Sequence, residues 1–269
     1  MRLSRLATLV IATAAFSACG KDTITNPALP PLAGVRFING LADSSGVDVR
    51  MIDQVNFSFE AIQNFTFRQG SEHQPIEAKA RQIRVFPNSN NPAITSAFMV
   101  DTTISFNANS RYTLLLTRET ATHVHFIVIN DDAPAVAAGQ IAIRAVNAST
   151  GAIDAYVTTL PGDPATPPAA AANLAAFTTS GYLSRATGNA AVRVTTAGSA
   201  VINASAAGPT AAAPLAGQLP AAAVNSAGTA FSVYYFPRSV AGTSAPQTTG
   251  VPNYTLPGVV WFVDRVPTS

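Results

Sequence analysis

An internal repeat constrains the fold of this 269-residue chain more than any other feature. Three pairs of segments recur in the same order with nearly constant spacing: 36–39 with 144–147, 47–49 with 153–155, and 64–85 with 173–194. The last pair aligns without gaps and matches Asn64 with Asn173 and Ser71 with Ser180. Self-similarity over this length is typical of tandem structural units. The sequence therefore predicts two copies of about a hundred residues each, a common size for one domain.

Short runs of β-branched and aromatic residues, separated by Asn, Gly, Asp and Pro, follow from Gly34 onward. They predict strands at 35–39, 47–52, 82–86, 97–106, 111–117, 123–130, 141–147, 153–158, 191–195, 229–236 and 259–263. No segment has a long helical period, and prolines limit the alanine-rich pieces 169–176 and 204–223 to a helical turn or two. Strands at this spacing favour an all-β fold of two tandem Ig-like β-sandwich domains. We expect these at residues 34–137 and 138–269, joined through the polar segment 131–140.

The repeated motif resembles a known family. Each copy has a strand that ends in asparagine, then an aspartate inside the next strand, namely Asn39 with Asp48 and Asn147 with Asp154. The second copy continues with Asn173-Leu174-Ala175-Ala176-Phe177, Ser180, Tyr182 and Val192-Arg193-Val194. This pattern resembles the DUF4397 domain, which implies two tandem copies and exported, surface-attached proteins, but no activity, because that family's function is unknown. The first copy departs from the pattern with His73 in place of Tyr182, and with Glu77 to Ala80 in place of a Pro-Ala-Gly turn.

The N-terminus predicts export and lipidation. Arg2 and Arg5 precede the apolar run 6–16, which is followed by small residues and Cys19. This is the layout of a secretory signal, and the run is too short to span a bilayer. Residues 16–20 resemble the lipobox of bacterial lipoproteins, which implies a signal peptide at residues 1–18 and a diacylglycerol on Cys19. Acyl chains such as palmitate would then hold the protein on a membrane, and Gly20 after the cysteine points to the outer membrane.

Charge and cysteine content narrow the possible partners. Residues 19–33 are polar and then proline-rich, which predicts a lipidated tether. Removal of Arg2 and Arg5 from the 16 basic residues leaves 14, equal to the 14 acidic residues, so we expect no nucleic-acid partner. The single cysteine excludes an intramolecular disulfide and a cysteine metal site. Besides the membrane, the expected partner is another envelope protein or a polysaccharide.

Metal binding is a minority hypothesis. His123 and His125 alternate on an expected strand and would point to one face, a geometry that can chelate zinc or copper if His73 or Glu119 adds a third ligand. The alternative is a solvent-facing polar side of the strand. We therefore expect no metal and no cofactor, with His123 and His125 as the candidates to watch.

Calcium is a second metal alternative. Asp131 and Asp132, with Asp101 or Asp43, could supply oxygen ligands, but their spacing matches no calcium loop and favours an inter-domain turn. Asp48 and Asp154 recur in both copies, which favours a shared structural role in bonding backbone N–H groups.

Nothing in the sequence indicates catalysis. Gly-x-Ser-x-Gly, Ser-x-x-Lys and a Cys/His pair are all absent, and the three histidines all lie in the first copy. We expect a non-catalytic binding or structural protein of the cell envelope, with no catalytic residue. The alternative is a glycan-acting enzyme, for which Asp48, Asp154, Glu60 and Glu119 are the available carboxylates. Tyr234, Tyr235, Trp261 and Phe262 form either an aromatic glycan-binding strip or, more in keeping with strand aromatics, part of the core.

Overall fold

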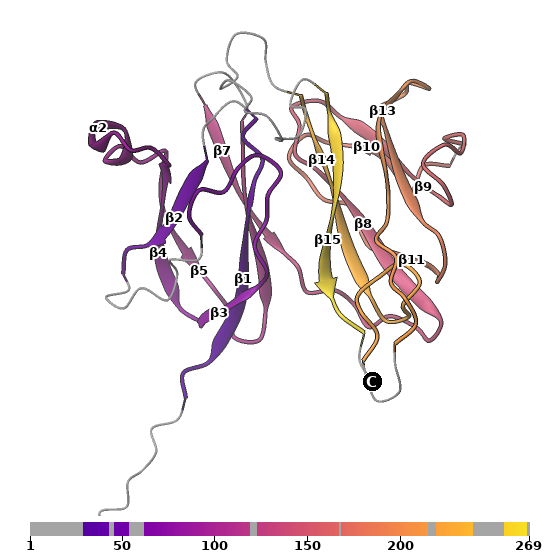
Figure 1. Ribbon diagram of the computed structural model, residues 1–269, viewed down its shortest axis with the longest axis horizontal. Coiled ribbons are helices and arrows are strands. Elements are labelled where there is room, and N and C mark those ends of the chain that lie inside the picture. The colour runs from indigo at the N-terminus through magenta and orange to yellow at the C-terminus, as the bar shows by residue number, and fades with distance from the viewer. Residues whose placement is uncertain are drawn as a thin grey trace, which may run out of the picture. The chain divides into compact units, whose positions relative to one another are not determined.

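The computed structural model describes residues 29–42, 46–53, 62–118, 123–166, 168–214, 219–238 and 256–267. These residues are almost entirely in strands and turns, so the all-β prediction is confirmed (Figure 1). Pro31–Ser269 forms one compact unit. Across the described residues there is no helix long and apolar enough to cross a bilayer. The signal segment and Cys19 lie outside the described residues.

The first half of this unit contains two sheets. Its strands are β1 (Leu32–Asn39), β2 (Val47–Met51), β3 (Gln74–Glu77), β4 (Ala80–Pro87), β5 (Val100–Ser105), β6 (Arg111–Arg118) and β7 (Val124–Asn130). One sheet has the order β3-β1-β6-β7 and the other has the order β2-β4-β5. Apolar side chains from both sheets, such as Val35, Phe37, Val85 and Leu114, form one buried cluster. This half is therefore sandwich-like.

The second half repeats the arrangement. Its strands are β8 (Gln140–Asn147), β9 (Ile153–Thr158), β10 (Ala171–Leu174), β11 (Leu183–Ala186), β12 (Ala191–Thr196), β13 (Ile202–Ala207), β14 (Ala230–Phe236) and β15 (Gly258–Arg265). The sheets have the orders β11-β8-β14-β15 and β10-β9-β12-β13. Ile143, Val194, Phe231 and their neighbours form its buried cluster.

Strand pairing matches between the halves. β1 lies parallel to β6, and β8 lies parallel to β14, whereas the other pairs are antiparallel. Arg36 is opposite Thr113 in the first half, and Arg144 is opposite Ser232 in the second. The pairings make Asp131, after β7, the counterpart of Asp264 on β15.

Side chains of the repeat also make equivalent hydrogen bonds. The Ser71 hydroxyl accepts the Phe37 backbone N–H at 3.0 Å, and the Ser180 hydroxyl accepts the Ala145 N–H at 2.9 Å. Residues aligned by the repeat therefore occupy equivalent places in the two sandwiches.

Strands β1 and β8 are buried on both faces. On β1, Val35 and Phe37 point into the first core, whereas Ile38 belongs to a third apolar cluster. That cluster takes residues from both halves, including Leu115 and Tyr234. Alternating side chains point to opposite faces of a strand, so the third cluster joins the two sandwiches through the outer faces of β1 and β8.

The alanine-rich segments, for which the sequence allowed a helical turn or two, contain β10 and the end of β13, because pairing with β9 and β12 outweighs the helix propensity of alanine. Among the described residues the helical turn is α2 (Pro92–Thr95), which Asn91 caps and Pro92 begins. It lies just before β5, which begins at Val100 and not at Ala97.

Candidate functional site

In each half a buried aspartate accepts the backbone N–H of an asparagine. Asp48 on β2 accepts the Asn64 backbone N–H at 2.8 Å, and Asp154 on β9 accepts the Asn173 N–H at 2.6 Å. Asn64 and Asn173 both have positive φ, which asparagine tolerates better than most residues. The two carboxylates lie in different sandwiches and bind backbone N–H groups, so they do not form one acid/base pair.

A network of buried charges links the two halves. Arg36 on β1 donates from Nη2 to Asp264 Oδ1 at 2.5 Å and from Nη1 to the carbonyl of the residue before Asp264 at 2.9 Å. Arg144 on β8 donates from Nη2 to Asp131 Oδ1 and from Nη1 to the carbonyl of the residue before Asp131 at 2.8 Å. The arginine of each half therefore binds the aspartate of the other half.

Hydroxyl groups complete the network. Arg36 Nε donates to Thr113 Oγ1 at 2.6 Å, and Thr113 donates to Asp131 Oδ2. In the second half Arg144 Nε donates to Ser232 Oγ at 2.7 Å, and Ser232 donates to Asp264 Oδ2 at 2.6 Å. The network is thus connected through both halves by the same kinds of group.

The halves differ at one position of the network. His73 Nε2 lies 3.0 Å from Asp131 Oδ2, whereas the Tyr182 hydroxyl donates to Asp264 Oδ2 at 2.9 Å. Burial, with the negative charge of Asp264 adding to it, raises the pKa of Tyr182, so the hydroxyl remains a neutral donor. The histidine that departs from the family pattern therefore binds the carboxylate equivalent to the one that Tyr182 binds.

The pKa values of the two buried carboxylates shift in opposite directions. For Asp131, burial opposes ionisation, but the hydrogen bond from His73 and the charges of Arg36 and Arg144 outweigh it and lower the pKa. For Asp264, burial raises the pKa, and the charge of Asp131 adds to that rise against the opposing effect of Arg36. Burial also opposes the charge of Arg36, yet Tyr234 and the two carboxylates leave its pKa above the ordinary value.

The charged side chains of the network are almost fully buried. Asp131 is 0% exposed, Asp264 1% and Arg36 2%. Charges buried this completely persist only when each is paired and hydrogen-bonded. The network therefore accounts for the junction of the halves and offers no free acid or base.

Residues 33–156 match the family described as a domain of unknown function, DUF4397. The chain contains a DUF4397 domain. The match includes the first half, continues through β8 and ends within β9. A search of curated proteins finds no match to this chain. Within the DUF4397 domain lie both arginines of the network, Arg36 and Arg144, and one of its aspartates, Asp131; Asp264 lies beyond it.

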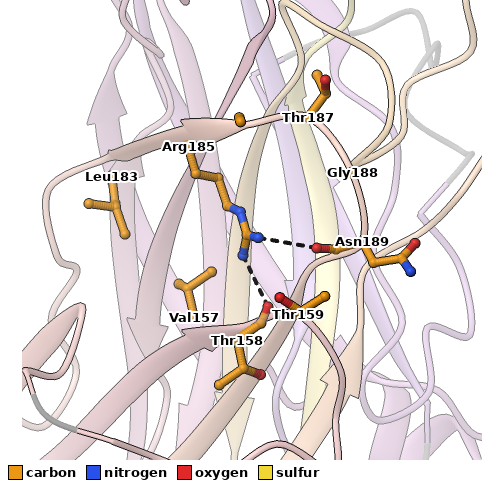
Figure 2. Close-up of a pocket in the computed structure, with 9 residues that line it drawn as sticks. Val157, Thr158, Thr159, Leu183, Arg185, Thr187, Gly188 and Asn189 are labelled. Atoms are coloured by element: carbon orange, nitrogen blue, oxygen red, sulfur yellow. Dashed lines mark hydrogen bonds between the residues drawn. The ribbon is translucent and has the colours of Figure 1, made fainter.

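A polar pocket of about 500 Å³ lies in the second half, where β9 and β11 end. Figure 2 shows the Arg185 side chain among Val157, Thr159, Leu183 and Thr187. Arg185 Nη1 donates to the Thr158 carbonyl at 3.0 Å, and Nη2 donates to the Asn189 carbonyl at 3.1 Å. Unlike the side chains of the buried charge network, this guanidinium is reached from solvent.

The histidines considered for metal binding are not gathered into a site. His125 on β7 stacks on Phe177 with ring centroids 4.4 Å apart, and His73 contacts Asp131. Within the part of the chain that the structure describes, no three His, Cys, Asp or Glu residues lie close enough to hold a metal. Glu119, the other candidate ligand beside His123, lies outside the described residues.

The acids considered for calcium are also separated. Asp131 lies in the network, whereas Asp132 accepts the Arg111 backbone N–H at 2.7 Å and the Asn130 side chain at 3.0 Å. Asp101 pairs with Arg84 on the other sheet of the DUF4397 domain, at 2.9 Å. Asp43 and Glu60 lie outside the described residues.

The aromatic residues of β14 and β15 do not form an open strip. Tyr234 and Tyr235 are buried, and Trp261 and Phe262 are partly buried against the second and third clusters. Trp261 packs edge-to-face on Phe231 with centroids 5.5 Å apart. These side chains therefore belong to the core of the second half and to the cluster that joins the two halves.

Sequence reasoning missed the network, although one signal was present. Arg36 and Arg144 recur at equivalent places inside apolar strands, and a charge there requires a buried partner. The partner was not found because Asp264 lies outside the aligned segments of the repeat, and Asp131 was interpreted as part of a linker.

Proposed function

We propose that the protein is a lipid-anchored, non-catalytic binding protein of the cell envelope, built from two tandem DUF4397 copies and held at the outer membrane through Cys19. The second copy is supported by the shared strand order, the parallel β8–β14 pair and the equivalent roles of Ser71 and Ser180. The lipid anchor is supported by the signal layout and by the lipobox at residues 16–20.

The observation that carries the non-catalytic role is how the buried carboxylates are used. Asp131 and Asp264 are buried in the junction and paired with arginines, and Asp48 and Asp154 bind backbone N–H groups in separate sandwiches. A glycan-acting enzyme needs an acid and a base facing one open cleft. The described carboxylates form no such pair, which favours a rigid body that presents its outer surface to a ligand.

Fractionation of cells tests the anchor. Cys19→Ala should move the protein from the membrane fraction to the soluble fraction, because acylation requires the thiol. Ser17→Ala, which retains the thiol, is the matched control and should remain with the membrane. Retention of the Cys19→Ala protein on membranes would contradict the proposal.

A further inference from the structure

Each half has an arginine near the ends of equivalent strands, although Arg81 lies on β4 and Arg185 on β11, and the two are bonded differently. In the first half the Arg81 guanidinium is buried and donates to Asp53 at 2.9 Å and to Glu77 at 3.1 Å. Asp53 follows β2, and Glu77 ends β3. In the second half Arg185 reaches between the end of β9 and the turn after β11, and among the described residues its bonds are to backbone carbonyls. The first half therefore supplies two carboxylates to its arginine, and the second half supplies none.

Strand register shows which residues replace those acids. Met51 pairs with Ile83 and Val157 pairs with Val192, so Asp53 and Thr159 lie two residues beyond equivalent positions. β3 and β11 pair with β1 and β8 in the same register, which aligns Glu77 with Ala186. A hydroxyl and a methyl group thus stand where the first half has two carboxylates, and the pocket lies beside both of them.

None of the acidic residues of the second half pairs with Arg185. Beyond Gln140 the sequence has three acidic residues. Asp154 accepts backbone N–H groups of Asn173 and Gly198, Asp163 accepts those of Thr159 and Leu160, and Asp264 lies in the buried network. The Arg185 guanidinium has five N–H donors, of which two are used within the described residues.

We propose that the Arg185 pocket binds a uronic acid residue of an acidic polysaccharide, with the sugar carboxylate occupying the place of the missing side-chain carboxylates. This inference deepens the proposed binding role and rests on it. A planar guanidinium matches a carboxylate in a bidentate geometry. The volume of about 500 Å³ exceeds what a carboxylate alone requires and suits a sugar ring.

The other lining groups favour a sugar over a peptide C-terminus. The side chains of Thr159, Thr187 and Asn189 make no hydrogen bonds to other described residues, which leaves them able to bond sugar hydroxyls. Capture of a peptide carboxylate uses a group of free backbone N–H donors. Here the N–H groups of Thr187 and Gly188 are already bonded to the Gly139 and Val224 carbonyls.

The test compares three probes on the purified full chain by titration calorimetry. Trigalacturonic acid should bind, and its trimethyl ester should bind at least about tenfold more weakly. Acetate should bind no more tightly than the ester. The ester retains the ring hydroxyls and loses only the charges. Equal binding of acid and ester would overturn the role of the carboxylate, and acetate binding as tight as the trisaccharide would overturn the sugar.

Variants locate the site. Arg185→Gln should weaken trigalacturonate binding about tenfold, and Thr187→Val, which leaves the guanidinium in place, should weaken it by a smaller factor. Arg265→Gln changes an arginine outside the pocket and should leave binding unchanged. Binding that survives Arg185→Gln would overturn the proposal, as would an Arg265→Gln effect of equal size. Because binding is measured in solution, its failure is independent of the Cys19→Ala fractionation result.

Discussion

The first half of the chain pairs its charges with one another on its own sheets, whereas the second half has few charges to pair. Arg81 contacts Asp53 and Glu77, and Arg84 contacts Asp101. Beyond Gln140 the sequence has eight charged residues. The two halves nonetheless share strand order and register, so the fold does not depend on these ion pairs of the first half.

The junction shows the opposite behaviour. There both halves keep an arginine, an aspartate and a hydroxyl in equivalent places, although the neighbouring apolar residues differ. The arrangement is an internal version of an isologous contact, in which each side offers the same groups to the other. The comparison shows that the buried charges of the junction recur in both halves, whereas the ion pairs outside it do not.

The largest expected effect on stability comes from removing one arginine of the network. Arg36→Met and Arg144→Met should each lower the free energy of unfolding by about 3 to 5 kcal/mol, because each leaves a buried carboxylate without its main partner. Urea unfolding followed by circular dichroism measures this. Arg84→Met, which removes an exposed pair, should cost about 0 to 1 kcal/mol. Equal costs at Arg84 and Arg36 would contradict the comparison.

Replacing the two aspartates of the network should have smaller and unequal effects on the free energy of unfolding. The lowered pKa of Asp131 means that its ionised form stabilises the fold above the unfolded pKa near 3.8, and that this stability is lost as pH falls through the folded value. The raised pKa of Asp264 has the reverse sign: its contribution is present below the unfolded pKa and is lost as pH rises through the folded value. Asp131→Asn should therefore destabilise more than Asp264→Asn at pH 7.

Unfolding midpoints measured from pH 7 down to about pH 3 test this difference. The gap between Asp131→Asn and Asp264→Asn should narrow as the pH falls, because protonation makes the wild-type carboxyl of Asp131 resemble the amide. A gap that widens toward low pH would reverse the assignment of the two carboxylates.

The smallest effect concerns the position at which the halves differ. Tyr182→Phe removes one hydrogen bond to Asp264 and should cost about 1 to 3 kcal/mol, as for bonds to charged groups. His73→Tyr gives the first half the side chain of the second and should change stability by less than about 1 kcal/mol if the phenol bonds Asp131. Thermal unfolding of both variants measures this, and a His73→Tyr loss as large as that of Tyr182→Phe would show that the positions are not interchangeable.

Much of the fold could be predicted from the sequence because the strands carry strong local signals. The expected segments 141–147 and 153–158 correspond to β8 and β9, and the segment 111–117 corresponds to β6. β3, β10, β11 and β13 were not predicted. They are edge strands with few β-branched residues, and they form because a neighbouring strand offers hydrogen bonds.

The candidate sites could not be predicted, because they depend on contacts between distant residues. Arg36 and Asp264 are separated by 228 positions, and no local pattern connects them. The Arg185 pocket depends on the lack of two side-chain carboxylates beside the guanidinium. That lack is visible only when Thr159 and Ala186 are superposed on Asp53 and Glu77. The role of His123 and His125 as metal ligands stays a hypothesis from the sequence. The domain boundaries 34–137 and 138–269 likewise stay predictions.

The position of β1 has a mechanical consequence. β1 is the first strand of the compact unit, and it is hydrogen-bonded on one side to β3 and on the other to the parallel strand β6. A force applied at Pro31 along the strand axis would load these hydrogen bonds in shear, all at once, instead of unzipping them one after another. The Arg36 bond to Asp264 would pass part of that load to β15, so tension at one end of the molecule would be shared by both sandwiches.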